Sequence, residues 1–171
     1  HFVEAIKRRI ELLKGLSLEN LEKAKAEIEL TPGAGELVQT MKANGAVTML
    51  ISGGLSIFTD HVRQLIGFDK AKGNDFEMVD NKLTGRLIEP VINKDAKLES
   101  FKLFAATNHI SSADTIAVGD GANDIPMLLE AGTAIAFHAK PIVNETIDLS
   151  IKYSDLTALL YIQGYRSSDF V

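Results

Sequence analysis

The sequence predicts an α/β fold, a Rossmann-like parallel sheet flanked by helices and preceded by part of a helical domain. Short, almost uninterrupted apolar runs at residues 46–51, 115–118 and 133–137 alternate with segments that have helical periodicity. Apolar runs of this length are typical of parallel strands that are covered on both faces. Turn-forming residues follow each run, and strands that alternate with helices in this way indicate a parallel sheet.

Composition narrows the class of protein. The 171 residues suit one domain, or one domain with a small insertion. With 18 Lys and Arg against 23 Asp and Glu, the net charge of −5 argues against a nucleic-acid groove, because phosphate backbones require a basic face. The absence of cysteine excludes disulfides, thiolate zinc sites and a cysteine nucleophile. No apolar run approaches the ~20 residues of a membrane span, and the first residues do not resemble a signal peptide, so we expect a cytoplasmic protein without nucleic-acid or membrane partners.

Three helices are predicted before the first strand, at 2–13, 18–28 and 31–44. Arg9 projects from the edge of the apolar face of the first helix. The planar fork of an arginine at such a place can bind a carboxylate or a phosphate. Alternatively, its stem only lies along the helix surface, which the periodicity alone favours.

Ser52, Gly53 and Gly54 directly follow the first apolar run. A serine hydroxyl and glycine N–H groups at the carboxyl end of a strand can hold phosphate oxygens without steric obstruction. Any tight turn would use the same residue types, so the tripeptide by itself leaves a purely structural role open.

A hairpin is predicted at 76–87, and an amphipathic helix at 94–107 carries Lys97 near its start. Lysines on a charged helix are normally solvated, and Lys94 and Lys102 are equally available on this one. The pattern alone therefore favours a solvated Lys97. The remaining predicted elements are a helix at 125–131, an edge strand at 148–151 and a closing helix at 156–162.

The most informative stretch is 115–127, in which Asp120 follows an apolar strand and Asp124 lies four residues later at a helix start. Two carboxylates placed in this way converge outside the carboxyl edge of the sheet, where ligands bind in open α/β folds. They repel each other unless a cation or a proton lies between them, and hard oxygen ligands favour Mg²⁺ or Ca²⁺. Alternatively, Asn123 or Asp124 only caps the helix.

Three motifs occur in an order that is typical of one family. Gly-Asp-Gly-Ala-Asn-Asp at 119–124 resembles the fourth motif of the haloacid dehalogenase-like phosphatases, and most of all that of their phosphoserine phosphatase branch. Ser52-Gly53-Gly54 is similar to the second motif, and Asp95-Ala96-Lys97 resembles the third. The resemblance implies hydrolysis of a small phosphomonoester, O-phospho-L-serine, through an aspartyl-phosphate. Another small phosphomonoester would use the same core.

The resemblance also assigns roles to the residues around the phosphoryl group. Ser52 and Lys97 would be catalytic, since both bind the phosphoryl group that is transferred and the lysine neutralises charge. Gly53, Gly54 and Asn123 would complete the phosphate-binding set.

The metal and the rest of the substrate would be held by other residues. Asp120 would ligate Mg²⁺, and Asp124 would support the metal and the lysine or bind the metal directly. Arg9 would bind the substrate carboxylate, and Phe2 would line the apolar part of the same pocket.

The chain departs from the family in one respect. The first motif, Asp-x-Asp-x-Thr, supplies the nucleophilic aspartate and the acid–base aspartate, and no Asp-x-Asp occurs in this sequence. We expect a fragment of a longer enzyme, with a partial helical cap at 1–30 and a phosphatase core at 31–171 that lacks its first strand. A missing N-terminal segment or a second chain would fill that place, and this chain alone is expected to be inactive. The alternative is a non-catalytic phosphate- or metal-binding module.

Overall fold

The computed structural model describes residues 2–171, with only the backbone described for Phe2. Residues up to Asn93, together with Val171, form one compact unit, and Lys94–Phe170 form a second. Parallel strands flanked by helices occur in both units, which confirms the predicted fold class. No helix in the described part of the chain is long and apolar enough to cross a bilayer. The predicted boundary between cap and core at residue 30 stays a prediction.

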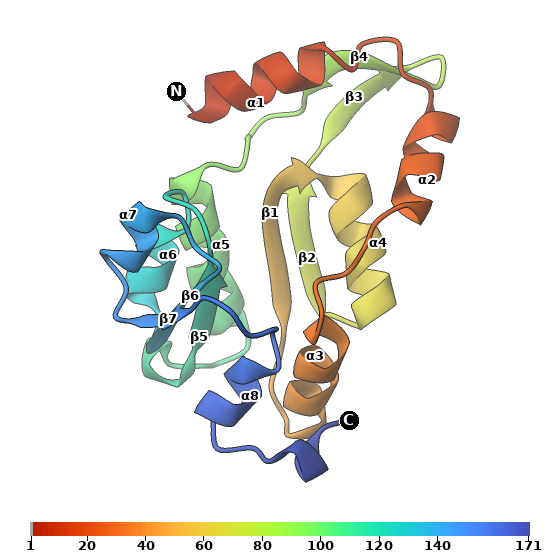
Figure 1. Ribbon diagram of the computed structural model, residues 1–171. Helices are drawn as coiled ribbons and strands as arrows, with labels where there is room; N and C mark the ends of the chain where they lie inside the picture. The colour runs from red at the N-terminus through yellow and green to blue at the C-terminus, as the bar shows by residue number, and fades with distance from the viewer. Residues whose placement is uncertain (1) are drawn as a thin grey trace. The chain divides into compact units, whose positions relative to one another are not determined.

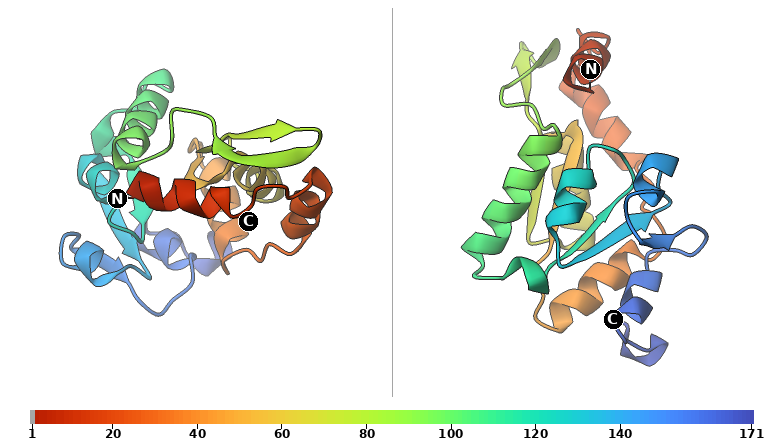
Figure 2. Two further views of the ribbon diagram at one scale, coloured as in Figure 1. Left: turned by 90° about the horizontal axis from the view of Figure 1, so that it is seen from above. Right: turned by 90° about the vertical axis from the view of Figure 1, so that its left-hand side faces the viewer.

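The first unit combines a parallel strand pair with an antiparallel hairpin. Helix α4 packs on both strands of the parallel pair β1–β2, and α1 packs on β4 of the hairpin β3–β4 (Figures 1 and 2). The hairpin turns at Asp80 and Asn81, whose φ values of 50° and 60° are the left-handed ones that a two-residue hairpin turn needs. The elements are α1 (Phe2–Glu11), α2 (Leu18–Ala26), α3 (Ala34–Ala43), β1 (Met49–Leu55), α4 (Ser56–Ile66), β2 (Lys70–Asn74), β3 (Phe76–Val79) and β4 (Lys82–Leu87).

Strand β1 is longer at its carboxyl end than the sequence predicts. The strand was expected to end at Ile51, but it continues through the two glycines to Leu55. Its pairing with β2 advances from Ile51 opposite Lys72 to Leu55 opposite Asn74, so β1 advances four residues while β2 advances two. The two extra residues make a β-bulge in the stretch 52–54.

Asp69 joins the beginnings of β1 and β2. Its carboxylate accepts hydrogen bonds from the Thr48 N–H (2.8 Å) and the Thr48 hydroxyl (2.9 Å), and it lies 2.8 Å from Lys42 Nζ. Partial burial raises the pKa of Asp69, but the hydrogen bonds from Lys42 and Thr48 outweigh burial and hold that pKa below its ordinary value. The ionised side chain of Asp69 thus holds the starts of β1 and β2 together.

The second unit is built on the parallel sheet β5–β6–β7, in that order. Helix α6 packs on β5, β6 and α5. Ile135 and Ala136 of β6 and Leu128 of α6 are fully buried and belong to the core of this unit. The elements are α5 (Lys94–Thr107), the 3-10 turn η1 (Ser112–Asp114), β5 (Ile116–Gly119), α6 (Ile125–Glu130), β6 (Thr133–Phe137), α7 (Pro141–Asn144), β7 (Leu149–Ile151), α8 (Ala158–Ile162) and the 3-10 turn η2 (Ser167–Asp169).

Candidate active site

The loop that joins β5 to α6 is organised by Asp124, whose side chain is buried. Asp124 Oδ2 accepts hydrogen bonds from the N–H groups of Asp120 (3.2 Å) and Gly121 (3.1 Å). The carboxylate therefore turns back into the loop instead of capping α6, and the interpretation of Asp124 as a simple helix cap is wrong. Gly119 makes this possible, because a Cβ atom there would lie 2.6 Å from Asp124 Cβ.

Lys97 completes the coordination of this carboxylate. Lys97 Nζ on α5 lies 2.5 Å from Asp124 Oδ1, and the two side chains are only 8% and 5% exposed. The solvated position that helix periodicity favours for Lys97 is therefore not the one it occupies. A buried ion pair of this kind is stable only while both charges and their hydrogen bonds are present.

Asp120 and Asn123 lie in the same loop but differ from Asp124 in exposure. Asp120 is exposed, and its backbone carbonyl accepts a hydrogen bond from the Lys140 N–H (2.9 Å). Asn123 is half-buried. The loop thus presents one exposed carboxylate at the carboxyl end of β5, next to the buried ion pair.

This loop suits Mg²⁺ better than a metal that needs a closed cage of protein ligands. Within residues 2–171, no three His, Cys, Asp or Glu side chains gather as a metal-binding group. Both oxygens of Asp124 already accept hydrogen bonds, which leaves Asp120 as the carboxylate that is open to a cation. Mg²⁺ commonly takes one or two carboxylates and fills its other positions with water and substrate phosphate. The donor set therefore fits Mg²⁺ with Asp120 as a ligand.

The bulge in the first unit contains three of the predicted phosphate-binding residues, Ser52, Gly53 and Gly54. The Gly54 N–H donates a hydrogen bond to Ser52 Oγ (3.0 Å), so hydroxyl and amide face each other across the bulge. The Gly53 carbonyl accepts a hydrogen bond from Asn74 Nδ2 (2.7 Å). Sequence reasoning did not single out Asn74. No local signal marked it, because the strand that Asn74 ends, Lys70–Asn74, has no β-branched or aromatic residue and was not predicted.

The predicted substrate-binding residues of α1 are described only in part. Arg9 is exposed on this helix, so its guanidinium is accessible to a ligand. The side chain of Phe2 lies outside the described part of the chain. Arg9, Ser52, Gly53 and Gly54 belong to the first unit, whereas Lys97, Asp120, Asn123 and Asp124 belong to the second.

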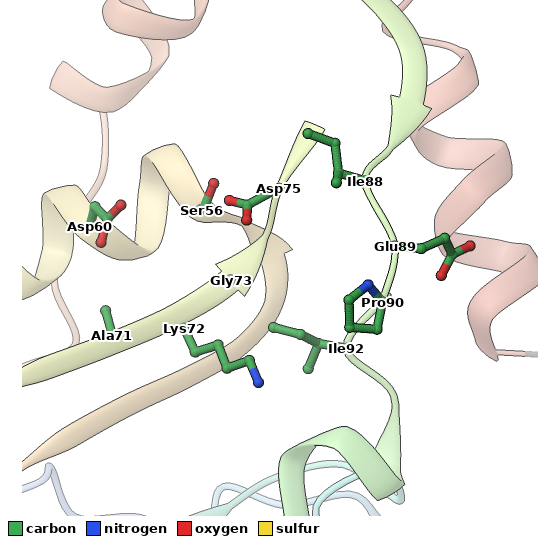
Figure 3. Close-up of a pocket in the computed structure, with 10 residues that line it drawn as sticks. All are labelled: Ser56, Asp60, Ala71, Lys72, Gly73, Asp75, Ile88, Glu89, Pro90 and Ile92. Atoms are coloured by element: carbon green, nitrogen blue, oxygen red, sulfur yellow. The ribbon is translucent and has the colours of Figure 1, made fainter. Parts of the chain in front are cut away.

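A pocket of about 340 Å³ lies beside the end of β2 in the first unit (Figure 3). Its acidic lining is partly neutralised, because the Glu89 carboxylate accepts hydrogen bonds from Lys7 Nζ (2.6 Å) and the Val91 N–H (3.1 Å). These bonds hold the pKa of Glu89 below its ordinary value. None of the predicted site residues is among the lining residues, which are Ser56, Asp60, Ala71, Lys72, Gly73, Asp75, Ile88, Glu89, Pro90 and Ile92.

The buried ion pair generates a prediction about stability. Replacing Lys97 by Met leaves the Asp124 carboxylate buried without its counter-charge, and we expect the free energy of unfolding to fall by about 3–5 kcal/mol. Lys102 on the same helix is the matched control, because its pair with Glu130 is 3.1 Å long and its side chain is 51% exposed. Lys102→Met should cost ~1 kcal/mol or less. Urea unfolding of both variants measures the difference, and equal losses would contradict the inferred burial of Lys97.

Comparison with known proteins places this geometry in a family. Residues 2–129 match the model of the haloacid dehalogenase-like hydrolases. The phosphoserine phosphatase of Methanocaldococcus jannaschii is 40% identical over 160 residues, which cover 94% of this chain and 76% of that protein. The phosphoserine phosphatase of Streptomyces coelicolor is 37% identical over 163 residues, which cover 95% of this chain but only 40% of the relative.

Solved structures agree with the sequence relatives. A phosphoserine phosphatase solved with bound substrate superposes with a TM-score of 0.89 at 40% identity, over 93% of this chain and 76% of that one. The family model thus covers more than half of the chain, and the similarity in sequence and in fold extends over nearly all of it. This chain belongs to the haloacid dehalogenase-like hydrolases, and the two relatives compared above are phosphoserine phosphatases of that family.

Proposed function

We propose that this chain carries the phosphate- and metal-binding residues of a phosphoserine phosphatase, which hydrolyses O-phospho-L-serine to L-serine and phosphate. The observation that carries the proposal is the buried Lys97–Asp124 pair beside the exposed Asp120 at the carboxyl end of β5. A lysine–aspartate pair on a solvated helix surface would not be buried. Burial of such a pair is expected where a lysine must be held in position against an anionic substrate. The relatives that carry the name phosphoserine phosphatase support the same substrate.

Several residues of this chain bind the phosphate, each through a different interaction. The Ser52 hydroxyl and the N–H group of Gly53 donate hydrogen bonds to phosphoryl oxygens, and the Gly54 N–H, which donates to Ser52 Oγ (3.0 Å), holds that hydroxyl in place. Lys97 balances the charge of the phosphoryl group, and Asp124 fixes the position of the Lys97 ammonium group. An ammonium group has three donors, so the bond to Asp124 leaves Lys97 able to donate to a phosphoryl oxygen.

The nucleophile of the proposed reaction is an aspartate that this sequence does not supply. The attack of that aspartate on phosphorus would release serine and form an aspartyl-phosphate, which water then cleaves to phosphate. The family's Asp-x-Asp-x-Thr motif is the proposed source, and no Asp-x-Asp occurs in the 171 residues. The part played by this chain is to bind and orient the phosphoryl group and to compensate its charge.

Mg²⁺ is the proposed cofactor, with Asp120 as a ligand, and it would supply charge stabilisation at the phosphoryl oxygens. Replacing Asp120 by Asn removes an anionic oxygen, so we expect the affinity for the cation to fall about tenfold or more. Mn²⁺ is a suitable probe, because it broadens the NMR signals of nearby amides and Mg²⁺ should displace it. Broadening at Gly121 and Ala122 should be lost in Asp120→Asn and kept in the control Asp114→Asn on η1. Equal broadening in both variants would remove Asp120 from the ligand set.

Arg9 is proposed to bind the carboxylate of phosphoserine. Two ligands isolate that interaction, since O-phosphoethanolamine lacks the carboxylate of O-phospho-L-serine and is otherwise alike. We expect Arg9→Ala to weaken phosphoserine binding by ~1.5–3 kcal/mol, the size of a hydrogen bond to a charged group, and to leave phosphoethanolamine binding unchanged. Arg8→Ala, the neighbouring exposed arginine on α1, should affect neither ligand. Titration calorimetry measures both ligands on the unaltered chain and on the two variants, and a similar loss for both ligands in Arg9→Ala would contradict a carboxylate-binding role.

A non-catalytic phosphate-binding module is the second candidate, because the groups proposed above bind phosphate whether or not an attacking aspartate is present. The two candidates differ in turnover. We expect no release of phosphate from phosphoserine by the 171-residue chain, and turnover by a protein that carries an Asp-x-Asp-x-Thr segment N-terminal to these residues. Phosphate release is measured with Mg²⁺ present, and Lys97→Met in the longer protein is the negative control. Turnover by the 171-residue chain alone would show that the proposed nucleophile is wrong, whereas an inactive longer protein would favour the module.

A further inference from the structure

Asn74 is the last residue of β2, and its side chain is almost completely buried, with 1% of the residue exposed. Both polar ends of the amide are used. Nδ2 donates to the Gly53 carbonyl and Oδ1 accepts from the Ile92 N–H, each at 2.7 Å. Asn74 therefore links the bulge in β1 to the segment that precedes α5.

The bond to Gly53 determines where the next amide points. A peptide group is planar and trans, so the carbonyl of Gly53 and the N–H of Gly54 point in opposite directions. Fixing the carbonyl toward Asn74 therefore fixes the Gly54 N–H on the other side, where it donates to Ser52 Oγ at 3.0 Å. Glycine allows many backbone conformations, so this peptide plane would rotate easily without an anchor.

The bulge explains why a side chain is needed here. Residues 52–54 lie between the paired positions Ile51 opposite Lys72 and Leu55 opposite Asn74, so the regular ladder has a gap. A partly buried carbonyl in such a gap still needs a donor from another source. The amide of Asn74 supplies it without adding a charge.

We propose that Asn74 is a positioning residue, which orients the Gly53–Gly54 peptide so that its N–H holds the Ser52 hydroxyl oxygen and leaves the hydroxyl hydrogen free to donate to a bound phosphate. The phosphate-binding part of this inference rests on the proposed function. The orientation of the peptide is independent of the proposed function, because it follows from hydrogen bonds that the chain makes without a ligand.

Two substitutions separate the two bonds of Asn74. Asn74→Asp keeps an acceptor for the Ile92 N–H but loses the donor to Gly53, whereas Asn74→Ala loses both bonds. Amide hydrogen exchange measured by NMR on the 171-residue chain at neutral pH should therefore respond differently. In Asn74→Asp, exchange at Gly54 should rise about tenfold while Ile92 stays protected, and in Asn74→Ala both amides should exchange faster.

Thr40→Val is the control for general loosening. Thr40 is also fully buried, but its hydroxyl accepts a hydrogen bond from the Val171 N–H instead of contacting the bulge. Neither Gly54 nor Ile92 should change in this variant. Unchanged exchange at Gly54 in Asn74→Asp, or equal acceleration at Gly54 and Ile92 in that variant, would overturn the proposed orientation of the peptide.

Inorganic phosphate tests the link to binding. Titration in the presence of Mg²⁺ should show about tenfold weaker phosphate binding in Asn74→Ala and unchanged binding in Thr40→Val. Faster exchange at Gly54 combined with unchanged phosphate affinity would overturn the positioning role. A failure of the unaltered chain to bind phosphate would count against the proposed function, and the exchange data would still decide whether Asn74 orients the peptide.

Discussion

The hydrogen bonds to the buried carboxylate of Asp124 are the constraint on which the site in the second unit depends. One oxygen holds two backbone N–H groups of the loop, and the other holds the ammonium group of Lys97. The side chain of Asp124 therefore fixes the conformation of the loop, the position of the Lys97 ammonium group and the direction of the backbone at Asp120, just after β5. This arrangement needs close approach of Asp124 to β5, which the missing side chain of Gly119 permits. The positions of Gly119, Asp120 and Asp124 therefore depend on one another.

The first unit solves a similar problem with a neutral group. Its bulge also needs a buried side chain that bridges two segments, and Asn74 does this as donor and acceptor at once. A carboxylate at that place could not donate to the Gly53 carbonyl, and its charge would repel a phosphate bound at the bulge. The charged Lys97–Asp124 pair therefore suits a place where the two charges compensate each other, whereas the neutral Asn74 suits a place where an added negative charge would repel phosphate.

Local sequence signals predicted much of the fold but little of the tertiary site. The helix at Lys94–Thr107 and the strand at Thr133–Phe137 have the predicted bounds, because apolar periodicity determines them locally. The strand Lys70–Asn74 was missed, since its sequence Lys-Ala-Lys-Gly-Asn has no β-branched or aromatic residue and forms a strand only by pairing with β1. Lys97 resembles the other lysines of its helix until Asp124, 27 residues later, packs against it. The candidate roles at this site came from motif resemblance and not from periodicity.

The number of extra residues in the bulge of β1 has a consequence for how this segment can vary. Successive side chains of a strand alternate between its two faces, and an insertion of two residues preserves that alternation. Leu55 therefore stays buried beyond the bulge, at 4% exposure. Adding or deleting a single residue between Ile51 and Leu55 would turn Leu55 toward the opposite face, whereas a change of two would not. We therefore expect a change of two residues between Ile51 and Leu55 to disturb the burial of Leu55 less than a change of one.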